Sequence, residues 1–269
     1  MPFSVLDDLI LADSLGIVPD DETLKLQPVF SDIGPTLEYH IHQSSGSGSL
    51  VRLESLPKSP AVLALLEAEQ TGSTSVSQRS LADLSARRLE VIRLSVNVND
   101  LSDPVYIAFG KRFQAAAEKS GFRTRIAAGI VGAFWEMVDN AIIHSNDANI
   151  ILAAYQASPT GIAYAIGDNG VGVLNSLRMS SFYSELDDHA TALKVAMTDG
   201  ESRFRSQPGR GRGFRHVFLS LAALRGQLRF RSGDHSLELD GRSPSLVNAS
   251  LHQRAFFRGF LASVQCQAD

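Results

Sequence analysis

Three short segments of the chain combine side chains that could bind a charged ligand and act on it. Residues 136–144 place an acid and an amide, Glu136 and Asn140, four residues apart. Residues 168–172 set Asp168 directly before two closely spaced glycines. Residues 209–214 alternate glycine with arginine. An acid, an amide, a further carboxylate and a glycine loop are the groups that a nucleotide site needs, so the set favours nucleotide binding.

Glu136 and Asn140 share one face of a helix, because residues four apart project from the same side, and His144 continues the row. An amide oxygen is a hard ligand that suits Mg²⁺, which takes phosphate oxygens into the same shell. A glutamate one turn away can orient or deprotonate a water molecule or a hydroxyl. The polar face of any amphipathic helix has a similar composition, which is the alternative interpretation of this segment.

Asp168 stands where a predicted strand ends and a glycine turn begins. A carboxylate at this position can accept a hydrogen bond from an exocyclic amine such as that of adenine. Gly170 and Gly172 would allow the backbone to approach a flat base closely. A plain Asp-Asn-Gly turn is the alternative.

Gly209, Gly211 and Gly213 precede a predicted helix over 214–224. Backbone amides at a helix amino end bind anions, so this loop favours phosphate. The sequence is neither a P-loop nor a dinucleotide fingerprint, and a flexible linker is the alternative. Nearby arginines could neutralise phosphate or form a solvated basic surface. They are Arg203, Arg205, Arg210, Arg212, Arg215, Arg225, Arg229 and Arg231.

The elements that must position these residues follow from periodicity and from turn signals. Strands are expected over 89–98, 149–157, 161–167, 226–232, 235–240 and 259–267, and helices over 104–121, 124–144, 187–197 and 214–224. Gly233-Asp234 is expected to turn a hairpin. Helices and hairpin-linked strands in this order predict an α+β fold, a two-layer sandwich of a mixed, mostly antiparallel sheet with helices on one face.

Residues 1–85 are expected to form a separate, small N-terminal α/β segment, a possible regulatory or partner-binding module. Alternation over 37–42 and 50–55 predicts a hairpin, residues 60–70 a short helix, and 71–77 a linker. The nucleotide-binding domain is expected over 86–269.

The composition of the chain excludes several classes of protein. The net charge of −4 argues against bulk binding to nucleic acid or to anionic membranes. A lone cysteine, Cys266, excludes an internal disulfide and is expected to be a small buried hydrophobe. The acidic amino terminus does not fit a signal peptide, and no apolar run suggests a membrane span, so a cytoplasmic protein is expected.

The three segments, in this order, resemble the ATP-binding domain shared by gyrase-type topoisomerases, heat-shock chaperones, histidine kinases and mismatch-repair ATPases, the GHKL superfamily. Residues 136–145 resemble its N-box, and 168–172 and 209–214 its two glycine boxes. The resemblance implies a Bergerat-like fold with ATP and Mg²⁺ as cofactors, and a lid over 173–208. It also implies the site residues. They are Glu136 as the catalytic or water-activating acidic residue, Asn140 as the Mg²⁺ ligand, Asp168 as the adenine contact, Gly170 and Gly172 in the base pocket, and Gly209, Gly211 and Gly213 on the phosphates.

The resulting expectation is a Mg-ATP-binding protein in bacterial regulation, a slow ATPase or a phosphotransferase. One alternative is a nucleotide-gated interaction switch without turnover. Another is a serine kinase resembling bacterial anti-sigma factors. A protein partner or a second copy of the chain could bind through the N-terminal segment.

Overall fold

The fold is taken from a computed structural model of the chain, which describes residues 33–45, 61, 63–65, 88–94, 101, 103–146, 148–198, 226–242 and 245–268. Several predictions lie outside these residues. They are the strand over 50–55, the linker at 71–77, the end of the strand over 89–98, the glycine loop and the helix over 214–224.

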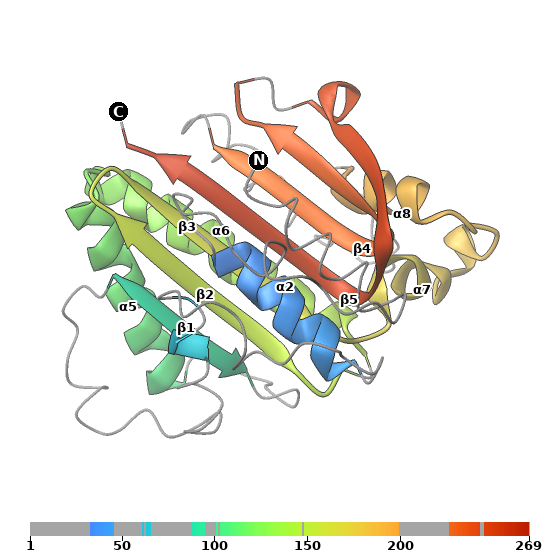
Figure 1. Cartoon of the computed structure of the whole chain (residues 1–269), viewed down its shortest axis with the longest axis horizontal. Coiled ribbons are helices and arrows are strands. Elements are labelled where there is room, and N and C mark those ends of the chain that lie inside the picture. Colours follow the sequence, from blue (N-terminus) through green and yellow to red (C-terminus); the bar gives the residue numbers. More distant parts are fainter. Residues whose placement is uncertain are drawn as a thin grey trace, which may run out of the picture.

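The centre of the molecule is a five-stranded sheet in the order β1-β2-β3-β5-β4, in which all neighbours run antiparallel. The strands are β1 (Leu89–Leu94), β2 (Ile151–Ser158), β3 (Gly161–Asp168), β4 (Gln227–Asp240) and β5 (Ser250–Gln267). The predicted α+β sandwich with an antiparallel sheet is confirmed (Figure 1).

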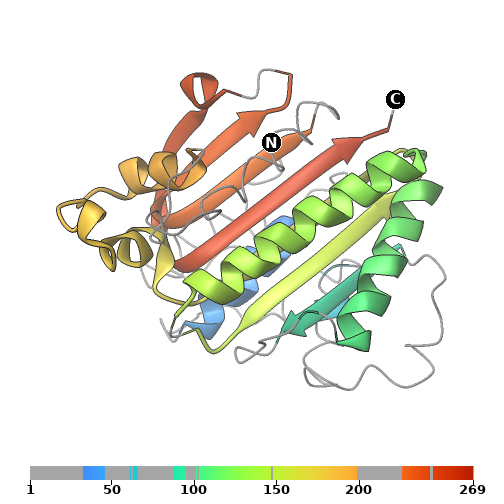
Figure 2. The same ribbon diagram turned by 180° about the vertical axis from the view of Figure 1, so that it is seen from behind.

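Two helices, α5 (Pro104–Lys119) and α6 (Thr124–His144), cover one face of the sheet (Figure 2). Both were predicted, α6 with the observed bounds. Pro104 opens α5 behind Asp103, whose side chain accepts a hydrogen bond from the Val105 amide at 2.8 Å. Thr124 is the first residue of α6, and no side chain caps that helix.

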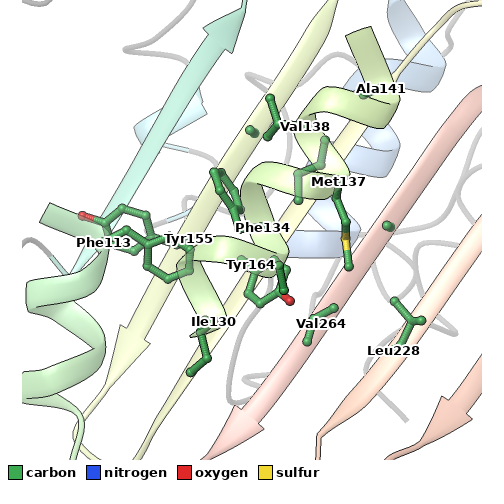
Figure 3. Close-up of a cluster of buried hydrophobic side chains, with 14 of the residues drawn as sticks. Phe113, Ile130, Phe134, Met137, Val138, Ala141, Tyr155, Tyr164, Leu228 and Val264 are labelled. Atoms are coloured by element: carbon green, nitrogen blue, oxygen red, sulfur yellow. The ribbon is translucent and has the colours of Figure 1, made fainter. Parts of the chain in front are cut away.

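Aromatic side chains fill the layer between these helices and the sheet (Figure 3). Phe113 of α5 stacks on Tyr155 of β2 with ring centroids 4.5 Å apart. Phe134 of α6 meets Tyr164 of β3 edge to face at 5.8 Å. Such pairs add to the burial of apolar area and fix α6 along β3.

A helix from the N-terminal segment, α2 (Ile33–Ser44), packs against the other face of the sheet (Figure 1). The prediction of a strand over 37–42 was therefore wrong. Ile33, Leu37 and Ile41 recur every four residues, and this spacing lines one side of a helix. Small residues on the sheet, Ala163 and Ala165 among them, let α2 lie close.

The predicted hairpin at Gly233 was also wrong, because β4 runs through this position as one strand. Gly233 takes a positive φ of 61° at a shift in register against β5, which is a β-bulge rather than a turn. Gly259 on β5 has a φ of 88° beside the same irregularity. Pairing continues on both sides of the bulge, so both strands are longer than predicted, and β5 begins at Ser250.

Two helices, α7 (Gly172–Arg178) and α8 (His189–Met197), lie at one end of the sheet (Figure 2). The sequence predicted α8 but not α7. This stretch begins the expected lid. Here it is anchored, because Leu193 and Met197 of α8 are buried in the main core against β4.

In the described residues one helix, α6, is long and apolar enough to cross a membrane by length and composition. From the sequence we expected no membrane span, because Glu136 and Asp139 interrupt the apolar residues of this helix. Its buried residues, such as Phe134 and Met137, pack on the sheet.

Candidate functional site

Asp168 is the last residue of β3 and is only 2% exposed. Successive strand residues alternate between faces, so Asp168 shares the α6 face with Tyr164 and Ile166, which lie in the main core. Its Oδ1 accepts a hydrogen bond from the Gly170 amide at 2.8 Å. The carboxylate is thus buried at a strand end and fixed by its own turn, as the sequence predicted.

The turn after Asp168 packs backbone to backbone against the end of α6. The Val171 amide donates a hydrogen bond of 3.0 Å to the Ser145 carbonyl, which follows the last turn of α6. A Cβ at Gly170 would overlap that same carbonyl. Only glycine allows this approach, and the structure therefore brings the first two predicted motifs together.

Glu136, Asn140 and His144 form a partly exposed row on α6. Trp135, on another side of the helix, packs against Phe109 of α5 with ring centroids 6.1 Å apart. From the helical repeat, the row lies on the flank away from α5, toward β5 (Figure 2). Asn140 precedes Ser145 by five residues, about 8 Å along the helix axis.

His144 ends the row and contacts α7. Its Nδ1 lies 3.2 Å from the hydroxyl of Ser176, which is buried. The sequence placed His144 in the row, and the structure adds a side-chain partner. The acid and amide row is therefore tied to the helix that follows the Asp168 turn.

Gly172 begins α7 with a φ of 76°, where a side chain would be strained. A Cβ there would lie 2.9 Å from the Ser232 hydroxyl and 3.1 Å from the Gly259 carbonyl. Ser232 in turn accepts from the Val173 amide at 3.0 Å and donates to Gly259 at 2.6 Å. The predicted base-pocket glycines thus have a packing role, which shapes the turn around Asp168.

Ser145, Asn169, Ser232 and Gly259 are site-building residues that sequence reasoning missed. Asn169 is buried, and its Oδ1 accepts hydrogen bonds from the Asn149 and Ile150 amides at 3.1 and 3.2 Å. Their partners are distant in the sequence, so no local pattern indicates them.

The third motif, Gly209, Gly211 and Gly213, lies outside the described residues. Of the arginines near it, Arg229 and Arg231 are described, and both are buried beside Glu38 of α2. Neither interpretation offered for these two, phosphate contact or solvated surface, was right. Alternation on β4 turns Leu228 and Phe230 toward the core beneath α6, which sends the arginines to the α2 face.

Within the described part of the chain no group of three or more His, Cys, Asp or Glu side chains could hold a metal ion. A metal at this site would therefore depend on few protein ligands and on phosphate oxygens, as Mg²⁺ often does. Asn140 offers the required oxygen. Cys266 is buried on β5, as predicted, and burial raises its pKa to about 12.

A comparison with protein-family models and a search of curated proteins each found no match for this chain.

Proposed function

We propose that this chain is a Mg²⁺-dependent ATP-binding protein of the GHKL type, which hydrolyses ATP slowly or transfers its γ-phosphate. One observation carries the proposal. The buried Asp168 turn is docked, backbone to backbone, on the end of the helix that bears Glu136 and Asn140. The carboxylate proposed to bind the base and the amide proposed to bind the metal therefore belong to two segments that are joined directly.

Each of the three candidate residues has a role that follows from its chemistry. Asp168 would accept a hydrogen bond from the adenine amine. Gly170 and Gly172 would fix the turn that carries Asp168, because other parts of the chain pack closely against both. Asn140 would hold Mg²⁺ by its amide oxygen, and the bound ion would neutralise phosphate charge. Glu136, one turn earlier on the same flank, would orient or deprotonate the attacking water or hydroxyl.

A titration with ATP and Mg²⁺, followed by a phosphate-release assay, tests the proposal on wild type and three variants. Glu136→Ala is expected to keep ATP binding and to lose turnover by about 100-fold or more, because general base catalysis contributes on that order. Asp168→Asn is expected to lose binding. Asp139→Asn is the matched control, because Asp139 lies on the same helix but is exposed.

Each result points to one function. No ATP binding by wild type rejects the proposal. Binding without turnover in wild type, with Glu136→Ala unchanged, indicates the nucleotide-gated switch instead. Transfer of the γ-phosphate to a serine of a co-purified protein indicates the anti-sigma-factor-like kinase. Equal loss in Asp139→Asn and Glu136→Ala would remove Glu136 from the mechanism.

A further inference from the structure

Helix α2 reaches the Asp168 turn from the face of the sheet opposite α6. The residue before Asp168 is Gly167, and a Cβ there would lie 2.7 Å from Cδ1 of Ile41 on α2. The residue after it is Asn169, whose Nδ2 donates a hydrogen bond of 3.4 Å to the Ser44 carbonyl at the end of α2. The N-terminal segment therefore contacts the chain on both sides of the candidate base-binding carboxylate.

Asn169 links three parts of the structure through one buried amide. Its oxygen accepts from the Asn149 and Ile150 amides, directly before β2. Its nitrogen donates to Asn149 Oδ1 at 2.6 Å as well as to Ser44. Movement of the end of α2 would thus remove a contact from the residue next to Asp168.

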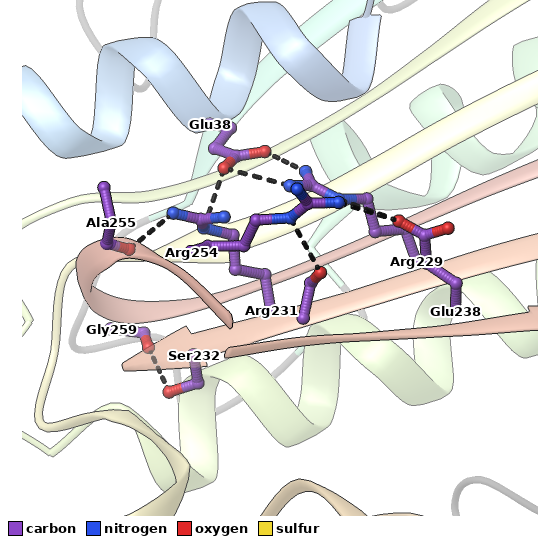
Figure 4. A network of polar contacts seen from close by, with 9 residues as sticks. Glu38, Arg229, Arg231, Ser232, Glu238, Arg254, Ala255 and Gly259 are labelled. Atoms are coloured by element: carbon purple, nitrogen blue, oxygen red, sulfur yellow. Dashed lines mark hydrogen bonds and ion pairs between the residues drawn. The ribbon is translucent and has the colours of Figure 1, made fainter. Parts of the chain in front are cut away.

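A buried charge network holds α2 on the sheet (Figure 4). Glu38 of α2 is 1% exposed and pairs with Arg229 and with Arg231 Nε, the latter at 2.8 Å. Arg231 also donates to the Ala255 carbonyl at 2.7 Å. Removal of the glutamate would leave two buried guanidinium groups short of their counter-charge, which is strongly destabilising for the contact.

We propose that α2 is a positioning element of the nucleotide site. Its docking sets the Asp168 turn through Ile41 and Asn169, so that loosening α2 lowers the affinity for ATP. This inference rests on the proposed function, and it gives the N-terminal segment a regulatory role through contacts on the far face of the sheet.

Two full-length variants test the coupling between α2 and the Asp168 turn, one at the turn and one in α2. Asn169→Asp keeps the two bonds accepted from the backbone directly before β2 but loses the bonds donated to Asn149 and Ser44. Glu38→Gln removes the charge that holds α2 without touching the turn. Each is expected to raise the Kd for Mg-ATP by about 5- to 10-fold, within the usual range of coupling between sites.

Glu238→Gln is the matched control for the charge network. Glu238 lies 3.8 Å from the same Arg229, but it belongs to β4 rather than to α2. This variant is expected to leave the Kd within about twofold of wild type, because the Glu238 side chain is 28% exposed and does not belong to α2. An equal loss of affinity in Glu238→Gln and Glu38→Gln would overturn the proposal.

Hydrogen exchange at the amides of 170–173, measured without nucleotide, separates this inference from the proposed function. Asn169→Asp and Glu38→Gln are expected to speed exchange there, and Glu238→Gln is not. Unchanged exchange and unchanged Kd in both variants overturn the role of α2. If wild type binds no ATP, the proposed function fails, and the exchange result still decides whether α2 holds the turn.

Ile41→Val covers the case in which Glu38→Gln does not fold. This change removes Cδ1 of Ile41, the atom that a Cβ at Gly167 would meet at 2.7 Å, and Ile-to-Val changes are mild. Faster exchange at 170–173 in Ile41→Val supports the proposal, and wild-type exchange contradicts it.

Discussion

Gly170 is the residue at which the two described motifs meet, and its lack of a side chain is what allows them to touch. Gly170→Ala would push a methyl group into the Ser145 carbonyl. We expect a loss of about 1–3 kcal/mol in the free energy of unfolding, the usual cost of overpacking. Urea-induced unfolding followed by circular dichroism measures the change.

The control for this variant is Gly132→Ala on the same helix, α6. A Cβ at Gly132 meets nothing within 4 Å, so the change only improves helix propensity. It should stabilise the protein by roughly 0.5–1 kcal/mol. If the two alanine variants lost equal stability, the contact between Gly170 and Ser145 would not be the cause.

At the residue scale, type and spacing predicted where the candidate groups lie. Asp168 ends a strand and Glu136 shares a helix flank with Asn140, as predicted, while their roles toward ATP stay predictions. It missed Asn169 and Ser145, because their role depends on partners that only the folded chain brings near. It also misplaced Arg229, whose counter-ion is distant in the sequence.

Among the elements, α6 was predicted with its observed bounds because its apolar residues keep one helical period for the whole length of the helix. The apolar residues in 37–42 fit both the period of a strand and the period of a helix. The segment forms a helix because its apolar side packs on the sheet. The Gly233-Asp234 pair carries a turn signal that a bulge also satisfies. Whether this pair forms a turn or a bulge depends on pairing with β5, which is distant in the sequence and is not visible in the local pattern.

The docking of α2 is expected to depend on pH through Glu38. Burial alone would raise the pKa of Glu38, but Arg229 and Arg231 outweigh burial, with a further contribution from His42, and lower it below its ordinary value of 4.5. Because the pKa of Glu38 is lower in the folded state, its ionised form stabilises the protein at any pH above the ordinary pKa. This stability is lost as the pH falls through the folded pKa.

We therefore expect stability to fall as the pH drops below about 4.5, with exposure of the apolar face of α2. Chemical unfolding at a series of pH values between about 3 and 7 measures this. Glu38→Gln should be less stable than wild type at pH 7 and should lack this part of the acid dependence. An identical slope in the variant would show that other carboxylates are responsible.

At the scale of the whole molecule, the described residues form a sheet with different helices packed on its two faces. The α6 face carries the candidate site, and the α2 face carries a buried ion network. Because the Asp168 turn contacts both covers, a ligand bound there should stabilise the molecule as a unit rather than one helix.

Saturating Mg-ATP is accordingly expected to raise the midpoint of thermal unfolding. A ligand at 100 times its Kd adds about 2.7 kcal/mol, which corresponds to roughly 5–10 °C for a domain of this size. Asp168→Asn should show no shift, and Asp139→Asn should show the full shift. Differential scanning fluorimetry with and without Mg²⁺ measures all three proteins, and an equal shift in Asp168→Asn would exclude that carboxylate as the base contact.

The ion pair between α2 and β4 has a consequence for how the chain is made. Glu38 and Arg229 are separated by 191 residues, and a ribosome adds about 5–20 residues per second. The acid is therefore synthesised roughly 10 to 40 s before its cationic partner. During that interval the apolar face of α2 has no completed sheet to cover, so the N-terminal helix must be among the last parts of the newborn protein to reach its place.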